Sequence, residues 1–159
     1  MPMQSLRDTV TVDKEVKFTL LRERACAPAY ATSGSAAADL RSAADEPITL
    51  RPGGRAMIPT GIAISLGSPE YVALLFARSG LAVKNGICLA NGVGVIDSDY
   101  TGEIMVALLN TSDRPFTVEP GDRVAQMAVV PVCNALFTPV DALEETDRGS
   151  GGFGSTGIK

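Results

Sequence analysis

The stretch RAMIPTGIAISLGSPEYVALLFA, residues 55–77, shows the pattern that decides the fold. Its apolar runs are short, and the turn signal Leu-Gly-Ser-Pro at 66–69 separates two of them. The turn signals RPGG, NTSDRP and EPGD repeat this arrangement elsewhere in the chain. Many short strands joined by regular turns are typical of an all-β sandwich or barrel.

Working outward from this stretch, we expect a strand within each short apolar segment. Alternation between apolar and polar residues is weak in several of them, which indicates strands buried on both faces, as a subunit interface would provide. Residues 79–86, SGLAVKNG, are the exception and are compatible with one or two helical turns. The expected strands fall within 16–21, 47–50, 55–66, 70–77, 86–96, 103–110, 115–120, 122–132 and 135–140.

The length of 159 residues indicates one domain. Residues 1–15 are polar and mixed, and we expect them to form a loose N-terminal arm. The strands of residues 16–140 would form the β-barrel domain. Residues 141–159 are first acidic and then rich in glycine, so we expect a mobile C-terminal arm.

The composition limits the compartment and the partners. A net charge of −4 argues against a protein whose main partner is nucleic acid or an anionic membrane. The N-terminal residues lack a signal-peptide pattern, and no apolar run approaches the ~20 residues of a membrane helix. We therefore expect a soluble, cytoplasmic protein. Its three cysteines, Cys26, Cys88 and Cys133, should be reduced, buried and not metal ligands.

Histidine is absent from the chain. This absence excludes Ser-His-Asp and Cys-His catalysis and the commonest zinc sites. A catalytic base, if there is one, would then be a carboxylate.

The most informative motif is GVIDSDYTGEI, residues 94–104, in which Asp97 directly follows an apolar strand. The opening resembles a calcium loop, but the twelfth position is Leu108 and not glutamate, which excludes an EF-hand. Two interpretations stay open. Asp97 either serves a β-turn, or is held rigidly at the strand end and orients a water.

Three further motifs place polar residues beside apolar ones, and each allows two interpretations. In ARSGLAVKNG, residues 77–86, Arg78 and Ser79 could cradle an anion, or Ser79 could merely cap a helix. In AADL, residues 37–40, Asp39 could hold a divalent ion through water or serve a turn. Gln126 lies among apolar residues and must bond either the backbone or a ligand.

The glycine-rich sequence RGSGGFGSTG, residues 148–157, is either disordered or becomes ordered on a ligand. Flexible backbone N–H groups can wrap phosphates, Arg148 can pair with a terminal phosphate, and Phe153 can stack on a base. Its formal G-x-G-x-x-G fails as a dinucleotide fingerprint because no strand precedes it and no helix follows.

Taken together and in this order, the motifs resemble the trimeric dUTPase family. The resemblance covers about residues 16–157 and rests on five motifs: AADL (37–40), RSGLA (78–82), NGVGVIDSDYTGEI (91–104), GDRVAQM (121–127) and RGSGGFGSTG (148–157). It implies a jelly-roll-like β-barrel or sandwich of many short strands with one short helix, and a catalytic role for residues 16–140.

The resemblance implies that Asp97 activates the attacking water. Tyr100 would stack on deoxyribose and exclude a 2′-hydroxyl. The other residues of this region would bind the substrate, mainly through a hairpin at 86–96 that reads uracil: Asn91, Val95, Ile96 and Met105.

The resemblance also implies a phosphate site and a closing arm. Asp39 would contact, through water, a Mg²⁺ ion held mainly by the substrate phosphates. The phosphate binders would be Arg78, Ser79, Gly80 and Gln126. The arm would close on triphosphate and base with Arg148, Phe153, Gly154, Ser155 and Thr156.

The implied activity is the Mg²⁺-dependent hydrolysis of dUTP to dUMP and pyrophosphate by attack at the α-phosphorus. It would supply dUMP for thymidylate synthesis and keep uracil out of DNA. The resemblance also implies a homotrimer whose sites draw on three chains, without nucleic acid or membrane as partner. Two alternatives are a dCTP deaminase of the same fold and a non-catalytic nucleotide sensor.

Overall fold

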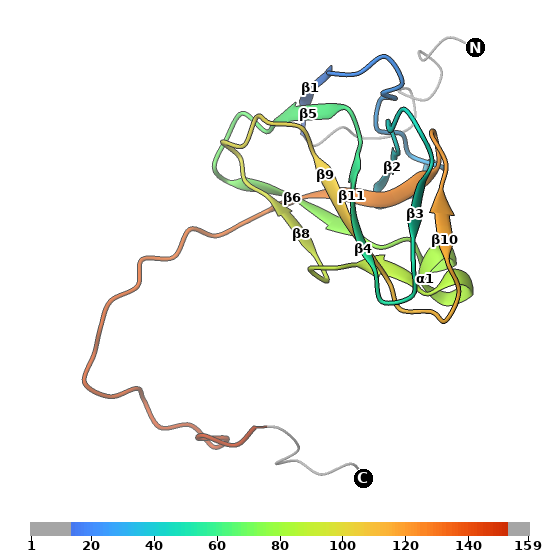
Figure 1. Cartoon of the computed structure of the whole chain (residues 1–159). Coiled ribbons are helices and arrows are strands. Elements are labelled where there is room, and N and C mark those ends of the chain that lie inside the picture. The colour runs from blue at the N-terminus through green and yellow to red at the C-terminus, as the bar shows by residue number, and fades with distance from the viewer. Residues whose placement is uncertain (1–13, 153–159) are drawn as a thin grey trace.

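The computed structural model describes residues 14–152, which form short β-strands and one helix (Figure 1). The first strands are β1 (Lys17–Leu20), β2 (Ala38–Arg41), β3 (Ile48–Leu50), β4 (Arg55–Pro59), β5 (Ile62–Ser65) and β6 (Tyr71–Phe76). They are followed by α1 (Ser79–Asn85), β7 (Ile87–Leu89), β8 (Gly94–Ile96), β9 (Met105–Asn110), β10 (Phe116–Val118) and β11 (Arg123–Pro131). The expected all-β class with one short helix is confirmed.

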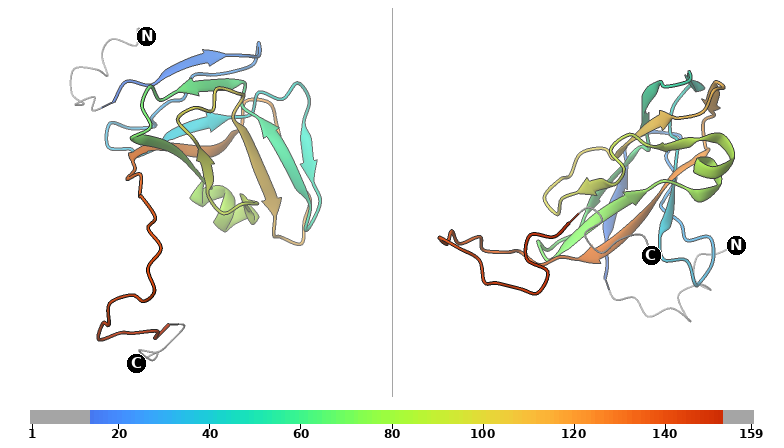
Figure 2. Two further views of the ribbon diagram at one scale, coloured as in Figure 1. Left: turned by 90° about the vertical axis from the view of Figure 1, so that its left-hand side faces the viewer. Right: turned by 90° about the horizontal axis from the view of Figure 1, so that it is seen from below.

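The strands pair into four sheets. The largest has the order β2-β11-β6-β8, and a three-stranded sheet has the order β4-β9-β7. The pairs β1-β5 and β10-β3 make up the other two. Figures 1 and 2 show these sheets wrapped around one interior, with α1 at one end. Within residues 14–152 the sheets do not close into a barrel, so the sandwich alternative describes the fold better.

The core lies between the sheets and is made of aliphatic side chains. Apolar burial of this kind is the main favourable contribution to folding. The largest fully buried apolar side chains come from most of the strands and the connections between them: Leu40, Leu50, Ile58, Ile62, Leu66, Ile87, Ile104, Val106, Leu108, Val118 and Val124.

The segment predicted at 55–66 divides into β4 and β5 because the chain turns at Gly61. Gly61 has a φ of 65°, and a Cβ there would come within 2.5 Å of the Ala25 Cβ atom. Only glycine fits both the left-handed backbone and this close approach. The segment at 86–96 likewise divides, into β7 and β8, but these strands do not form the expected hairpin, because β7 pairs with β9 and β8 pairs with β6.

Two expectations about strands need correction. No strand was expected at AADL, residues 37–40, but Ala38–Arg41 form β2, in which Ala38 lies opposite Met127 of β11 and Arg41 opposite Arg123. Residues 135–140 form no strand, and Leu136 and Phe137 are more than nine-tenths exposed. After β11 the chain runs away from the sheets (Figures 1 and 2), so this segment has no strand to pair with.

The three cysteines are free, as predicted, but their predicted burial is wrong for two of them. Cys26 and Cys133 are exposed, and only Cys88 is partly buried. Cys133 lies directly after β11 on the segment that leaves the sheets, which explains its exposure.

Candidate active site

A buried carboxylate, Asp39, gathers polar side chains from three separate motifs. Its Oδ1 atom accepts hydrogen bonds from Arg78 Nε at 3.1 Å and from Gln126 Nε2 at 3.4 Å. Its Oδ2 atom accepts one from Arg123 Nη1 at 3.0 Å. Asp39 is 7% exposed, so these bonds form in a partly desolvated environment where charge-assisted bonds are strong.

The sheet register creates this cluster. Asp39 on β2 lies opposite Gln126 on β11, and Gln126 lies opposite Phe76 on β6. Arg78 comes two residues after Phe76, where the chain leaves β6 and enters α1. Residues far apart in the sequence are therefore brought together at one end of the four-stranded sheet.

The cluster answers one question that the sequence left open and adds a partner for Gln126. The Gln126 amide donates to the Asp39 side chain, which neither interpretation from the sequence had named. Ser79 is not the helix cap: the N-cap residue of α1 is Arg78, and no side chain caps the helix. Ser79 and Gly80 are exposed in the first turn of α1.

Arg123 was not singled out from the sequence, although it lies in the motif GDRVAQM. The Arg123 side chain is 42% exposed, so it meets Asp39 while remaining open to solvent. The sequence signal that could have identified Arg123 was its position, since it begins β11 three residues before Gln126. A β-bulge between Arg123 and Ala125 on β11 displaces the regular alternation of side chains there, which sequence periodicity does not reveal.

A cavity of about 350 Å³ lies beside the cluster. Three guanidinium-bearing residues, Arg41, Arg78 and Arg123, contribute to its lining together with one carboxylate residue, Asp122. Arg41 is held by a bond from its Nη1 atom to the Gly121 carbonyl at 2.8 Å. The excess of positive charge suits an anionic ligand.

Asp97 lies elsewhere, directly after β8, and is exposed. Its carbonyl accepts the Tyr100 N–H at 3.1 Å, which closes a turn. Asp97 borders a broad hollow of about 930 Å³ whose other walls include Val95, Tyr71 and Val130. The carboxylate therefore sits on a fixed turn with its side chain open to an incoming group.

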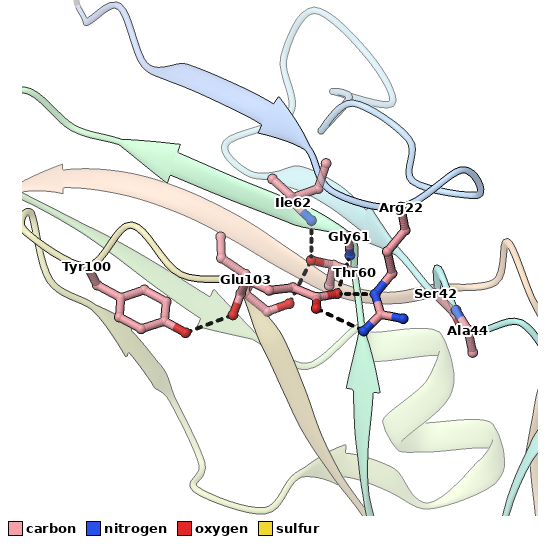
Figure 3. Close-up of polar contacts among 9 residues, drawn as sticks. Arg22, Ser42, Ala44, Thr60, Gly61, Ile62, Tyr100 and Glu103 are labelled. Carbon is pink, nitrogen blue, oxygen red and sulfur yellow. Dashed lines mark hydrogen bonds and ion pairs between the residues drawn. The ribbon is translucent and has the colours of Figure 1, made fainter.

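Tyr100 is fixed through Glu103, as Figure 3 shows. The Tyr100 hydroxyl donates to the Glu103 carbonyl at 2.8 Å. The Glu103 carboxylate forms an ion pair with Arg22, with 2.7 Å between Oε1 and Nε. The hydrogen bond to Arg22 holds the pKa of Glu103 below its usual value, and the same bond raises that of Arg22. Sequence reasoning missed both residues because 81 positions separate them.

The loop between β7 and β8 carries Asn91, which is exposed at its tip. Backbone bonds from Gly92 to Leu89, at 3.1 Å, and from Val93 to Asn91, at 2.8 Å, shape the tip. Along the rest of this region Val95 is 60% exposed, whereas Ile96 and Met105 are partly buried.

The two groups of predicted site residues do not meet within the chain. Asp39 is on β2 and Asp97 follows β8, and these are the two edge strands of the four-stranded sheet. Three strand spacings of about 4.8 Å separate them across the sheet. The residue of β6 level with Asp39 is Phe76, whereas the residue of β6 level with Ile96 is Ala73. The distance from Ala73 to Phe76 along β6 adds about 10 Å to the separation of the two sites.

The arm residues are also apart from the sheets. Arg148 is exposed, and its Nε atom donates to the Gly151 carbonyl at 2.9 Å. Figures 1 and 2 show the segment that carries it well away from the strands. The predicted arm residues Phe153, Gly154, Ser155 and Thr156 lie outside the described residues. So do residues 1–13, which make up most of the predicted N-terminal arm.

Within residues 14–152, no group of three or more cysteine, aspartate or glutamate side chains is arranged to hold a metal ion. No helix in that part of the chain has the length and apolar character needed to cross a membrane. The fold and the clustered arginines describe a small β-sheet protein that presents positive charge around one buried carboxylate, as an anion-binding protein does.

Comparisons with known proteins agree with this description. The sequence model of the dUTPase family matches residues 23–157. The chain is 52% identical over 155 residues to the deoxyuridine 5′-triphosphate nucleotidohydrolase of Chromobacterium violaceum, covering 98% of this chain and 99% of the relative. It is 51% identical over 143 residues to the protein of that name from Paraburkholderia xenovorans, covering 90% and 97%.

Solved structures give the same result. The dUTPase of Staphylococcus bacteriophage 80alpha with dUpNHpp has a TM-score of 0.82 and 27% identity, covering 91% of this chain and 99% of that chain. A variant of the dUTPase from phage phi11 of S. aureus, described with the coordination of a structural Mg(II) ion, has a TM-score of 0.74 and 25% identity, covering 83% and 100%. The chain therefore belongs to the dUTPase family. The predictions of a jelly-roll-type fold and of an enzyme are confirmed.

Proposed function

We propose that this chain hydrolyses dUTP, the substrate in the names of its relatives, and that the products are dUMP and pyrophosphate. The observation that supports the proposal most directly is the convergence of Asp39, Arg78 and Gln126, from three of the family's motifs, at one end of the four-stranded sheet. Such an enzyme would supply dUMP for thymidylate synthesis and keep uracil out of DNA.

The guanidinium of Arg78 would bind the triphosphate, assisted by Ser79, Gly80 and Gln126. The Asp39 carboxylate orients Arg78 and Gln126 before substrate arrives. Pre-organised donors favour charge that develops in a transition state, because little reorganisation remains when the bond breaks. Arg123 belongs to the same cluster and would add positive charge beside the phosphates.

Asp97 would act as general base. Its carboxylate would accept a proton from the water that attacks the α-phosphorus, as pyrophosphate leaves. The turn closed by Tyr100 fixes the Asp97 backbone, so that the exposed side chain can reach a water without a large entropy cost.

Base and sugar recognition would fall to the loop between β7 and β8 and its neighbours. Backbone groups near Asn91 would pair with uracil, assisted by contacts from Val95, Ile96 and Met105. Tyr100 would lie on the deoxyribose and exclude a 2′-hydroxyl. A backbone that matches uracil leaves groups unpaired with cytosine, which can give discrimination of about 10⁴ or more.

A site that uses both Asp39 and Asp97 needs more than one copy of the chain, because the two residues lie at opposite edges of one sheet. We therefore propose a homotrimer in which one copy contributes the Asp39 cluster and another contributes Asp97. Arg148 and residues 153–156 would close over the site from a further copy. The described part of this arm, which runs away from the sheets after β11, favours an arm that reaches a neighbouring chain.

Mg²⁺ would neutralise part of the triphosphate charge and stabilise the negative charge that develops as pyrophosphate leaves. The Asp39 carboxylate suits a contact to the ion through water, since its Oδ2 atom accepts only one of the hydrogen bonds described. Two guanidinium groups flank this carboxylate and would repel a free cation. The substrate phosphates would therefore supply most of the ligands.

The test is the release of pyrophosphate from dUTP, dCTP, dTTP and UTP, each with and without Mg²⁺. We expect release from dUTP alone among the four, and only with the metal. Ammonia released from dCTP would instead indicate a deaminase. Saturable dUTP binding without pyrophosphate would indicate a nucleotide sensor.

A further inference from the structure

The turn that carries Asp97 and Tyr100 is bound, at its C-terminal end, to a residue from the beginning of the fold. Arg22 donates two hydrogen bonds to the Glu103 carboxylate, from Nε to Oε1 at 2.7 Å and from Nη2 to Oε2 at 3.0 Å (Figure 3). The Gly61 N–H donates a third, to Oε1 at 2.8 Å. A bidentate pair of this kind fixes orientation as well as distance.

Glu103 passes this orientation to Tyr100 through its own backbone. The carbonyl of Glu103 accepts the Tyr100 hydroxyl at 2.8 Å. The ring can lie over the turn because residue 102 is glycine: a Cβ there would be 2.7 Å from the Tyr100 hydroxyl oxygen. The ring is still 45% exposed, so few packing contacts would hold it if the hydroxyl lost its acceptor.

The frame behind the ion pair is buried and does not depend on the ion pair itself. Ile104, directly after Glu103, donates its N–H to the Ile62 carbonyl at 2.7 Å. Its carbonyl accepts the Thr60 hydroxyl at 2.7 Å. Arg22 is placed by its neighbour Leu21, whose N–H donates to the Gly61 carbonyl at 2.7 Å. Removing the Arg22 guanidinium should therefore loosen the turn without unfolding the sheets.

We propose that Arg22 and Glu103 are positioning residues that hold the Tyr100 ring in place, and that they thereby set the discrimination between deoxyribose and ribose. This inference rests on the role proposed above for Tyr100. Neither side chain needs to touch the nucleotide. With the ring held, a 2′-hydroxyl would collide with it, and with the ring free to move, the ribose would fit.

The experiment compares kcat/KM for dUTP and UTP in the wild type and in Arg22→Met, with Arg22→Lys as the conservative variant. Arg24→Met, a change on the same loop and outside the Glu103 contact, is the control. We expect Arg22→Met to narrow the dUTP-to-UTP ratio by about tenfold or more, because small displacements of a positioning group have large kinetic effects. Arg22→Lys should retain part of the wild-type dUTP-to-UTP ratio, and Arg24→Met should retain all of it. An unchanged ratio in Arg22→Met overturns the inference.

A second measurement does not need turnover. Hydrogen exchange in the free protein should be faster in Arg22→Met at the Tyr100 amide, and unchanged at buried β9 amides such as that of Val106. Equal exchange at Tyr100 overturns the inference, whatever the activity. If the wild type hydrolyses no dUTP, the proposed function fails, while the exchange result still decides the positioning role. Should Arg22→Met not fold, Glu103→Gln provides the same two comparisons.

Discussion

Asp39 and Asp97 lie at opposite edges of one four-stranded sheet, with β11 and β6 between them. Both carboxylates belong to the proposed site, but one chain cannot bring them to the same phosphate group. In the proposed mechanism, association of copies is therefore required for catalysis as well as for stability.

Mixing two inactive variants should therefore restore activity. Arg78→Ala removes the phosphate-binding side of the site and Asp97→Asn removes the base. If the two residues serve one site from different copies, an equal mixture unfolded and refolded together should contain intact sites in about a quarter of cases. The measurement is pyrophosphate release, against each variant refolded alone. A mixture as inactive as its components would mean that both residues act from the same chain.

Asp97→Asn should lower kcat by about 10² to 10⁴, the usual contribution of a general base, while dUTP still binds. The amide keeps the size of the side chain but cannot take the proton. Isothermal titration with dUTP measures binding, and Asp99→Asn, a change on the same turn, is the matched control. A variant with wild-type turnover would exclude Asp97 as the base.

A chain ending at Asp147 lacks Arg148 and the glycine-rich sequence. We expect its kcat/KM for dUTP to fall by about 100-fold, because closure over the substrate excludes water and completes the site. Its thermal unfolding should match that of the full chain, since the segment after β11 runs away from the sheets. The single variant Arg148→Ala separates the effect of the charge from that of the arm. Equal rates in all three would leave the arm without a catalytic role.

Mg²⁺ binding should depend on the nucleotide. Two guanidinium groups flank Asp39, so the free protein should bind the ion at least about tenfold more weakly than the complex with dUTP does. Titration of Mg²⁺ into Asp97→Asn, with and without dUTP, measures the difference in a protein that does not consume the substrate. Tight binding to the free protein would show that protein ligands, and not phosphates, hold the ion.

Acid should weaken the Arg22–Glu103 contact. The folded-state pKa of Glu103 is lowered, mainly by the hydrogen bond from Arg22 and against the opposing effect of burial. A lowered pKa contributes stability that is present above the unfolded value, 4.5, and lost as pH falls through the folded value. The free energy of unfolding of the wild type should therefore approach that of Glu103→Gln as the pH falls below 4.5 and through the folded-state pKa. If the free energies of unfolding of the two proteins changed in parallel with pH, the Arg22–Glu103 pair would contribute no pH-dependent stability.

Local sequence patterns predicted the fold class well because each strand is short, apolar and bounded by turn residues. The division of 55–66 depends on Gly61, whose tight packing against Ala25 is a tertiary contact. Residues 135–140 have the composition of a strand, but among the strands of residues 14–152 none lies beside them. Composition indicates a preference, whereas pairing decides the structure.

The site was predictable to the extent that motifs carry it. Arg78 and Gln126 were identified, but their shared partner is the Asp39 side chain, which no local pattern indicates. Arg22 and Glu103 meet across 81 positions, and only the path of β1 past Gly61 brings them together. Long-range pairs of this kind depend on the whole topology.

The single carboxylate shared by Arg78, Arg123 and Gln126 has a consequence for mutational scans. Removing any one donor lets the Asp39 carboxylate and the other two donors rearrange. The effects of the three substitutions are therefore thermodynamically coupled. Their separate losses should sum to more than the loss in the triple variant. A residue-by-residue scan would then count one interaction network several times.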